Sequence, residues 1–355
     1  MDFPVPDTKI IEASEEDMKD AVSEACALLD AGEVVALPTE TVYGLAADAT
    51  NPLAAAKVFE AKQRPSFDPL LVHIGSRADL GKVAKVPDEI CEVVAGLADA
   101  FWPGPLTLIL PKQDVIPDIV TSGLSTVGVR QSGNAIFRAI NKKLGKPIAA
   151  PSANRFGRIS PTSARAVEKE LGGRIPLIVN GGACSEGLES TIISIEPRQG
   201  KKPIFRLHRA GPITKEMLQK FGKVEKPKPL VVEGNPSTTH LTVAPGTLAS
   251  HYAPATPLRI VENPEDFTPQ PGKRYALLCY KGGEDDPFVR RHQWEFVEAL
   301  SPGTGKLSEA AVRLFYAMRL LDEAGVDEII VEPVSEKGLG LAIMDRLRRA
   351  AHKDP

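Results

Sequence analysis

Apolar residues recur at two different spacings along the first part of the chain, and the two spacings predict helices and strands in alternation. Between residues 15 and 31 the spacing is helical, and one apolar face is formed by Ala21, Val22, Ala25, Leu28 and Leu29. Gly32 ends this helix, and the apolar run at residues 34–37 predicts a short buried strand. Asn51 followed by Pro52 then predicts the start of a second helix, which runs to about Lys62.

The same two patterns continue as far as residue 222. Strands are expected at residues 70–74, 106–110, 126–130, 147–150, 177–180 and 191–195. Helices are expected at residues 88–100, 135–144, 161–171 and 212–221. This mixture predicts an α/β domain over residues 1–222, built on an open twisted sheet.

Composition changes after residue 222. Residues 223–256 are rich in proline and polar residues and are predicted to form a linker, which contains Ser-His-Tyr-Ala-Pro at residues 250–254. Strands predicted at residues 258–261, 274–279 and 328–332, with a helix at 307–324, indicate a smaller Rossmann-like α/β domain over residues 257–355. Its first strand is not followed by Gly-x-Gly-x-x-Gly, and residues 303–306 do not fit the P-loop frame.

Length and composition are typical of a two-domain globular protein. The chain has 355 residues, of which 43% are hydrophobic and 25% charged, with a formal net charge of −3. No apolar run reaches the roughly 18 residues that span a bilayer, and the first residues lack a signal-peptide pattern, so a cytoplasmic location without membrane association is expected. The four cysteines have no paired spacing, which favours reduced thiols over a zinc site.

Polar residues follow several of the predicted strands. The segment Pro-Thr-Glu-Thr-Val-Tyr-Gly-Leu at residues 38–45 directly follows the strand at 34–37, and residues 150–162 contain a run of hydroxyls with Arg155 and Arg158. Ser160 is expected to cap the helix that begins at Pro161, and a helix N-terminus beside arginines suits an anion. Ligands of open α/β sheets collect where strands end, so these segments predict one binding site.

Each of these residues alone also has an ordinary structural role, as a turn hydroxyl, a core histidine or a helix-end cation. Their recurrence at several strand ends favours a site. The sequence shows no Ser-His-Asp order and no His-Glu-x-x-His motif. Cations and hydroxyls suit a polyphosphate, for which positioning and charge neutralisation carry most of the catalysis. The residues therefore predict either a nucleotide-using α/β enzyme or an anion-binding module.

The motifs PTETVYGL, KQRP, PLLVHI, FWPGPLT, TVGVR, APSAN, ISPT, ESTI and RAGPI, in this order, closely resemble the YrdC-like family. With SHYAP and a C-terminal α/β domain, the chain resembles the long two-domain form of that family. The resemblance implies a concave, positively charged cavity. It also implies a nucleotidyltransferase that condenses L-threonine, bicarbonate (as CO2) and ATP to threonylcarbamoyl-AMP and pyrophosphate. The product would pass to a separate transferase that modifies tRNA next to the anticodon.

The resemblance also implies roles for particular residues. The threonine-binding residues would be Thr41, His73, Arg130 and Ser190, with Arg130 holding the carboxylate bidentately. The ATP-binding residues would be Lys62, Arg64, Asp68, Thr126, Ala150, Ser152, Asn154, Ser160, Arg209, His251 and Tyr252. Lys62 and Arg64 would be catalytic by offsetting phosphate charge. Mg²⁺ would arrive with the triphosphate rather than in a protein cage. The SHYAP segment would cover the cavity as a lid that excludes water.

Some positions depart from the family pattern. Asp68 stands where asparagine is frequent, and Gln-Ser-Gly-Asn at residues 131–134 replaces a Pro-x-His-Pro pattern. Glu40 has no implied role, and it is expected either to orient a cation such as Lys62 or to face solvent. Two other functions stay open. One is a module that binds double-stranded RNA or tRNA without catalysis, and the other is carbamoyl-adenylate chemistry in hydrogenase maturation. Weak tRNA binding by the enzyme itself is a further option.

Overall fold

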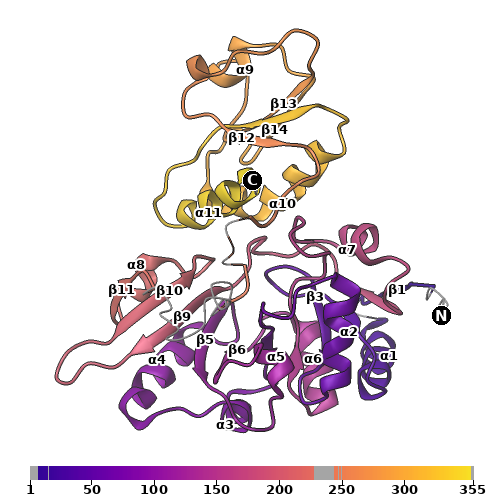
Figure 1. The fold of residues 1–355 in the computed structure, drawn as a ribbon, viewed down its shortest axis with the longest axis vertical. Coiled ribbons are helices and arrows are strands. Elements are labelled where there is room, and N and C mark those ends of the chain that lie inside the picture. The colour runs from indigo at the N-terminus through magenta and orange to yellow at the C-terminus, as the bar shows by residue number, and fades with distance from the viewer. Residues whose placement is uncertain (1–6, 15, 228–243, 247, 249, 353–355) are drawn as a thin grey trace.

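The structure is a computed structural model that describes residues 7–14, 16–227, 244–246, 248 and 250–352. These residues form two sheets flanked by helices, a large one in the N-terminal part and a small one in the C-terminal part (Figure 1). The predicted fold class is therefore confirmed. No helix in the described ranges is both long and apolar enough to cross a membrane.

The large sheet is mixed and has the order β1-β8-β2-β3-β7-β4-β6-β5-β9-β10-β11. Its strands are β1 (Lys9–Glu12), β2 (Val35–Leu37), β3 (Gly44–Asp48), β4 (Leu71–His73), β5 (Leu106–Pro111), β6 (Thr126–Arg130), β7 (Ile148–Ala149), β8 (Leu177–Asn180), β9 (Thr191–Glu196), β10 (Ile204–Arg209) and β11 (Lys223–Glu225). Strands β4 and β6 pair in parallel, with His73 opposite Arg130. This register brings two of the predicted site residues to the same edge.

Helices cover both faces of the large sheet. They are α1 (Met18–Asp30), α2 (Pro52–Lys62), α3 (Leu80–Val83), α4 (Cys91–Phe101), α5 (Asp118–Thr121), α6 (Ala135–Leu144), α7 (Ala164–Leu171) and α8 (Lys215–Leu218). Helices α1 and α6 share one core with β2, β7 and β8. Helices α2, α4 and α7 contribute to a second core with β3, β4, β5 and β6. The strand ends at the site are therefore fixed by packing on both sides of the sheet.

The C-terminal domain has a parallel sheet of order β12-β15-β13-β14. Its strands are β12 (Leu258–Ile260), β13 (Tyr275–Cys279), β14 (Phe296–Ala299) and β15 (Glu328–Val331), and its helices are α9 (Pro287–Arg291), α10 (Leu307–Asp322) and α11 (Gly340–Ala351). Helices α10 and α11 lie on the side of this sheet that faces the N-terminal domain (Figure 1). The parallel sheet agrees with the predicted Rossmann-like arrangement.

Two predicted element starts are wrong. Helix α7 begins at Ala164 rather than at Pro161, and the Ser163 hydroxyl caps it by accepting from the Ala166 N–H. The Ser160 side chain does not cap that helix and instead donates to Glu189 Oε1 at 2.5 Å. The helix predicted at 212–221 is reduced to α8, which Thr214 caps.

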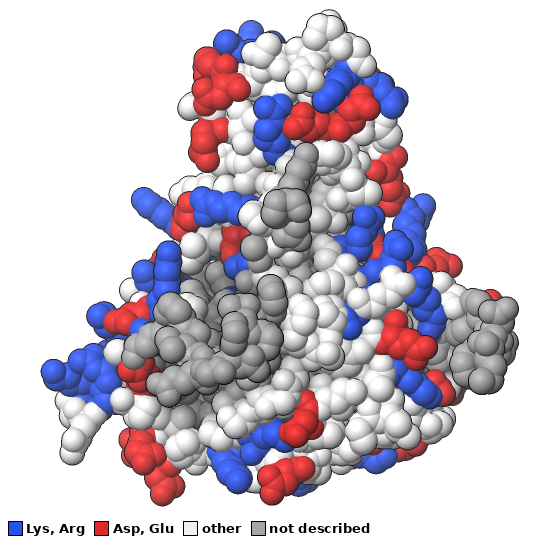
Figure 2. All heavy atoms as spheres, in the orientation of Figure 1, with Lys and Arg blue, Asp and Glu red and all other residues white. Residues whose placement is uncertain are grey.

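Several elements were not predicted, among them β1, β3, β10, β14 and α11. Strand β11 lies in the region predicted as linker, where it pairs in parallel with β10. Most of the remaining predicted linker, residues 228–243, lies outside the described residues. Charged residues of both signs alternate over the face shown in Figure 2.

Candidate active site

A cavity lies where several strands of the large sheet end. The loop after β2 contributes Thr39 and Thr41, β4 contributes Leu71 and His73, and β6 contributes Arg130. The loop after β7, the segment before β9 and the end of β10 complete the wall with Ala150, Pro151, Ser152, Glu189, Ser190 and Arg209. The polar strand ends that the sequence singled out therefore converge on one site.

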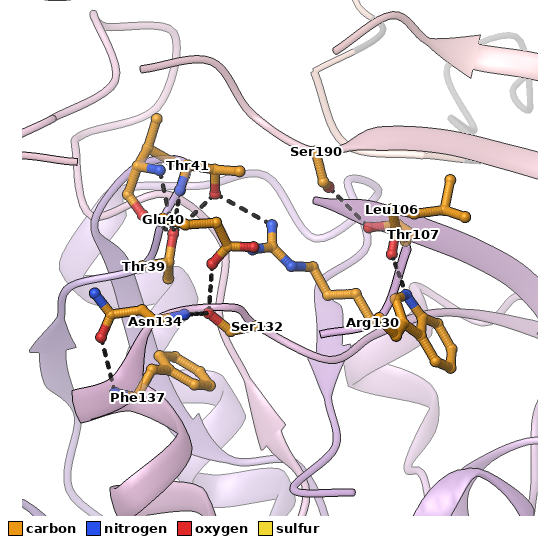
Figure 3. A network of polar contacts seen from close by, with 12 residues as sticks. Thr39, Glu40, Thr41, Leu106, Thr107, Arg130, Ser132, Asn134, Phe137 and Ser190 are labelled. Atoms are coloured by element: carbon orange, nitrogen blue, oxygen red, sulfur yellow. Dashed lines mark hydrogen bonds and ion pairs between the residues drawn. The ribbon is translucent and has the colours of Figure 1, made fainter. Parts of the chain in front are cut away.

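The loop after β2 is held by its own hydroxyl groups. Thr39 Oγ1 donates to the Val42 carbonyl at 2.6 Å and accepts from the Thr41 and Val42 N–H groups at 3.1 and 3.2 Å. The Thr39 and Thr41 hydroxyls also lie 2.8 Å apart (Figure 3). Thr39 therefore shapes the loop, and Thr41 presents its hydroxyl toward Arg130.

Arg130 is the centre of a polar network that includes Glu40 (Figure 3). Its Nη2 donates to Glu40 Oε1 at 2.5 Å and its Nη1 donates to Thr41 Oγ1 at 3.1 Å. Ser132 donates to the other Glu40 oxygen at 2.6 Å. Burial opposes ionisation of Glu40, but Arg130 and Ser132 outweigh it and hold the pKa of that carboxyl below its ordinary value.

This network answers the question about Glu40. The carboxylate orients a cation, and that cation is Arg130 rather than Lys62. Both terminal nitrogens of Arg130 are already engaged, and its Nε is the nitrogen without a partner in the part of the chain that the structure describes. A guanidinium has five N–H donors, so Arg130 keeps donors for a ligand beside its contacts to Glu40 and Thr41.

His73 and Ser190 complete this half of the cavity. His73 is buried, and its Nδ1 has no hydrogen-bond partner in the described ranges. Burial, with the nearby Arg130 charge, holds the pKa of His73 well below its ordinary value, so the ring is neutral near pH 7. The Ser190 hydroxyl lies 2.7 Å from Thr107 Oγ1 on β5 and accepts from Arg209 Nη2 at 3.0 Å.

Three basic residues of the predicted ATP-binding set are buried, and of these Arg64 and Arg209 line the cavity while Lys62 does not. The Lys62 ammonium, at the end of α2, donates to the carbonyls of Ser152 and Asn154. Burial and the nearby Arg64 charge hold the pKa of Lys62 well below its ordinary value. Arg64 forms an ion pair with Asp68 at 2.8 Å, and both side chains are almost fully buried. Asp68 is therefore engaged by Arg64.

The segment predicted to act as a lid is described at residues 244–246, 248 and 250–254, and Pro245, Gly246, His251 and Tyr252 of this segment line the cavity. Arg209 Nη1 donates to the Pro245 carbonyl at 3.1 Å, and the Ala253 N–H donates to the Gly157 carbonyl at 2.8 Å. His251 and Tyr252 are buried and line the cavity. Burial, followed by the nearby cations Arg64 and Lys62, holds the pKa of His251 well below its ordinary value.

With the lid in this position the cavity measures about 40 Å³. Pro245, Gly246, His251 and Tyr252 form part of its lining, so the position of this segment sets the size of the space that the other walls enclose.

Comparison with known proteins identifies the family. A family model described as "Telomere recombination" matches residues 27–208, and one described as "Threonylcarbamoyl-AMP synthase, C-terminal domain" matches residues 213–352. The threonylcarbamoyl-AMP synthase of Pyrococcus abyssi is 39% identical over 327 residues, which cover 92% of this chain and 93% of that protein. The chain belongs to the threonylcarbamoyl-AMP synthase family.

Other relatives agree with this assignment. The threonylcarbamoyl-AMP synthase of Bacillus subtilis is 40% identical over 339 residues, covering 93% of this chain and 92% of that protein. A crystal structure of Pyrococcus abyssi Sua5 complexed with L-threonine superposes with a TM-score of 0.79 at 35% identity, and each chain is covered to 97%. Members of the synthase family are nucleotidyltransferases of tRNA threonylcarbamoyladenosine processing, so this chain is an enzyme of that type.

The residues with a predicted family role fall into two groups, those that line the cavity and those that do not. The cavity is lined by Thr41, Arg64, His73, Arg130, Ala150, Ser152, Ser190, Arg209, His251 and Tyr252. The residues that do not line it are Lys62, Asp68, Thr126, Asn154 and Ser160. Lys62, Asp68, Asn154 and Ser160 lie buried behind the wall, and Thr126 lines a smaller adjoining cavity whose border includes Pro245. Movement of the lid would change the wall between the two cavities.

Three residues of this site were not predicted from the sequence. Glu189 lines the cavity, Thr107 contacts Ser190, and Arg346 of α11 forms an ion pair with Glu189 at 2.9 Å. Glu189 stands in the Glu-Ser-Thr motif at a strand end, which is the signal that could have identified it. Thr107 closes the motif FWPGPLT, which is the signal that could have identified it, whereas nothing in the local sequence marks Arg346, whose partner Glu189 is distant in the chain.

No group of three or more acidic, histidine or cysteine side chains that could hold a metal ion occurs in the described ranges. Two carboxylates of this region are also engaged, Glu40 by Arg130 and Glu189 by Arg346. The residues present therefore do not fit a metal cage made by the protein alone.

Proposed function

We propose that this enzyme makes L-threonylcarbamoyl-AMP from L-threonine, bicarbonate or CO2, and ATP, with release of pyrophosphate. The product then goes to a separate transferase that modifies tRNA next to the anticodon, in the cytoplasm. Mg²⁺ would enter with ATP, held by phosphate oxygens and water, and would help to neutralise the triphosphate.

One observation carries this proposal: two buried basic side chains of the predicted ATP site form no ion pair with a carboxylate in the described ranges. Lys62 and Arg209 are 1% and 6% exposed, and their hydrogen bonds go to carbonyl or hydroxyl oxygens. Burial lowers the pKa of both side chains, and an anionic ligand would stabilise their charged forms. A triphosphate would be such a ligand.

The proposed reaction has two steps. The threonine amine attacks the carbon of CO2 and loses a proton, which gives a carbamate. A carbamate oxygen then attacks the α-phosphorus of ATP, a new P–O bond forms, and the bond to the β-phosphate oxygen breaks, so that pyrophosphate leaves. No side chain needs to become covalently attached.

The described residues support these steps by position and charge. Thr41, His73, Arg130 and Ser190 line the same cavity, where Thr41 contacts Arg130 directly, and together they would orient threonine. Lys62, Arg64 and Arg209 would offset the charge that develops on the phosphates. The closed lid would keep water from the carbamate and from the mixed anhydride.

The alternative function is RNA binding without catalysis. A sequence-independent RNA contact needs a broad basic surface, because phosphate contacts supply most of the affinity. Charges of both signs are interspersed on the face of the molecule shown in Figure 2. The cations that stand out in this chain are instead buried around a small cavity, which favours a small anionic ligand.

The test is a turnover assay of the pure protein with ATP, labelled bicarbonate and single amino acids. Threonine-dependent formation of pyrophosphate and of labelled threonylcarbamoyl-AMP is expected. Arg130→Ala should weaken threonine far more than ATP, while Arg138→Ala, a change on α6 outside the cavity wall, serves as the matched control. RNA binding without threonine-dependent turnover would overturn the proposal.

A further inference from the structure

Arg346 is a fully buried arginine of the C-terminal domain that contacts the catalytic site. It lies on α11, and its Nε donates to Glu189 Oε2 at 2.9 Å while its Nη2 donates to the Ala210 carbonyl at 2.9 Å. Its guanidinium carbon also lies 5.2 Å from the centre of the Tyr252 ring. One side chain therefore contacts the cavity wall and the lid at the same time.

The contact with Glu189 extends further into the N-terminal domain. Glu189 lines the cavity, and its second oxygen accepts the hydrogen bond from Ser160. Burial opposes ionisation of Glu189, but Arg346 and Arg209 outweigh it and hold its pKa below the ordinary value. Arg346 thus supplies the charge that lets an ionised carboxylate stay in this buried wall.

The contact with Tyr252 supports a strained part of the lid. Tyr252 has a φ of +63°, a backbone conformation that is unfavourable for a bulky side chain. The ring is held by stacking on Phe315 of α10, with the ring centres 5.5 Å apart, and by Arg346 over its face. A strained residue persists where its surroundings fix it, and both of these contacts come from the C-terminal domain.

A second arginine of the same helix contacts the lid at two further points. The Arg349 side chain donates to the Leu248 carbonyl, and its backbone carbonyl accepts from the His251 N–H at 3.3 Å. On the opposite side the lid meets the N-terminal domain through the Pro245 and Ala253 contacts. The lid therefore has anchors on both domains, and its anchors on the C-terminal side lie on α10 and α11.

We infer that α11 of the C-terminal domain holds the lid closed, with Arg346 as a positioning residue for Tyr252 and Glu189. This inference deepens the proposed function and rests on it, since a closed lid matters for a reaction that water can intercept. Pro245, Gly246, His251 and Tyr252 of the lid line the cavity, so an open lid would admit ATP and a closed lid would retain the intermediate. The C-terminal domain would set the balance between these two states.

The experiment compares variants of the full chain. Arg346→Met removes the charge and the contact to Glu189, and Arg349→Ala removes the side-chain contact to Leu248. The matched control is Arg348→Ala, because Arg348 lies on the same helix and pairs with Glu336 on the exposed surface. Glu189→Gln combined with Arg346→Met separates lid opening from the cost of an unpaired buried carboxylate.

The first measurement is hydrogen exchange of the ligand-free protein over residues 250–254. Arg346→Met should exchange at least about tenfold faster there than the wild type, because a buried ion pair and a ring contact are lost. Arg349→Ala should exchange faster to a smaller extent, and Arg348→Ala should match the wild type. If Arg346→Met does not fold, the comparison of Arg349→Ala with Arg348→Ala decides.

The second measurement is the amount of pyrophosphate released for each threonylcarbamoyl-AMP captured. This ratio should rise in Arg346→Met while threonine affinity stays at the wild-type level. A general loss of folding would lower threonine affinity as well and would not produce this combination. Unchanged lid exchange in both α11 variants, or an equal increase in Arg348→Ala, would overturn the inference. Absence of turnover in the wild type would refute the proposed function instead, and lid exchange would still test α11.

Discussion

Removing the Glu40 carboxylate should destabilise the protein, because it leaves the Arg130 guanidinium buried without its counter-charge. The two side chains are 10% and 3% exposed, and their ion pair measures 2.5 Å. In Glu40→Ala the Ser132 hydroxyl loses its acceptor as well. Glu40→Gln keeps the shape of the side chain and one acceptor oxygen, so it isolates the contribution of the charge.

The expected magnitude follows from the burial of the pair. Breaking a buried ion pair by removing one partner costs about 3–5 kcal/mol. For a domain of this size 1 kcal/mol corresponds to about 2–4 °C in melting temperature, so Glu40→Ala should melt roughly 6–20 °C lower. Arg130→Met combined with Glu40→Gln should recover part of this loss, because neither charge is then left unpaired.

The assay is thermal melting of the full chain at several pH values. The pKa of folded Glu40 lies below its ordinary value of 4.5, so the pair stabilises the protein fully above about pH 4.5 and loses its effect as pH falls through the folded pKa. The difference in stability between wild type and Glu40→Gln should be constant from pH 6 to 8 and should shrink below pH 4.5. Each unit by which folding lowers the pKa of Glu40 corresponds to about 1.4 kcal/mol of that difference. A gap near zero at neutral pH, or one that does not change with acid, would refute this reasoning.

Two further predictions concern the buried wall. Ser160→Ala leaves one Glu189 oxygen without its hydrogen bond and should cost about 1–3 kcal/mol of stability. Ser163→Ala removes the cap of α7 and should cost about 1 kcal/mol. Thermal melting of both variants checks this order. An equal or reversed order would contradict the contact to Glu189. ATP binding should draw protons onto Lys62, because burial and Arg64 lower its pKa in the free protein and an added polyanion raises it. Calorimetry in buffers of different ionisation heat should show net proton uptake that grows with rising pH, and uptake that persists in Lys62→Met would assign it to another group.

Much of the site could be predicted from the sequence because its residues stand at strand ends within recognisable motifs. Thr41, His73 and Arg130 each follow or end an apolar run, and the parallel register of β4 and β6 then places His73 opposite Arg130. The strands that pack between helices were predicted because their residues form short apolar runs. Strand β3 was missed because Gly-Leu-Ala-Ala-Asp has neither alternation nor β-branched residues, and its neighbours β2 and β7 stabilise it through long-range pairing.

The contacts that complete the site could not be predicted, because their partners are far apart in the chain. Glu40 meets Arg130 across 90 residues, and Arg346 meets Glu189 across 157. The wrong role of Ser160 has a related cause, since its hydroxyl was predicted to serve the adjacent helix and instead serves Glu189, 29 residues away. Local propensity describes what a residue can do next to its neighbours, and tertiary packing decides which partner it takes.

The charges of the site are divided in a way that would match the two proposed substrates. Arg130 and Arg64 each have a carboxylate from the chain itself, so those parts of the site are close to neutral. Threonine is a zwitterion without net charge, and the Arg130–Glu40 pair would offer it a cation and an anion side by side. Lys62 and Arg209 form no ion pair with a carboxylate in the described ranges, and under the proposed function a triphosphate would bring negative charge to them. We therefore expect threonine affinity to change little with ionic strength and ATP affinity to fall as salt rises, because the net charge brought to the site differs between them.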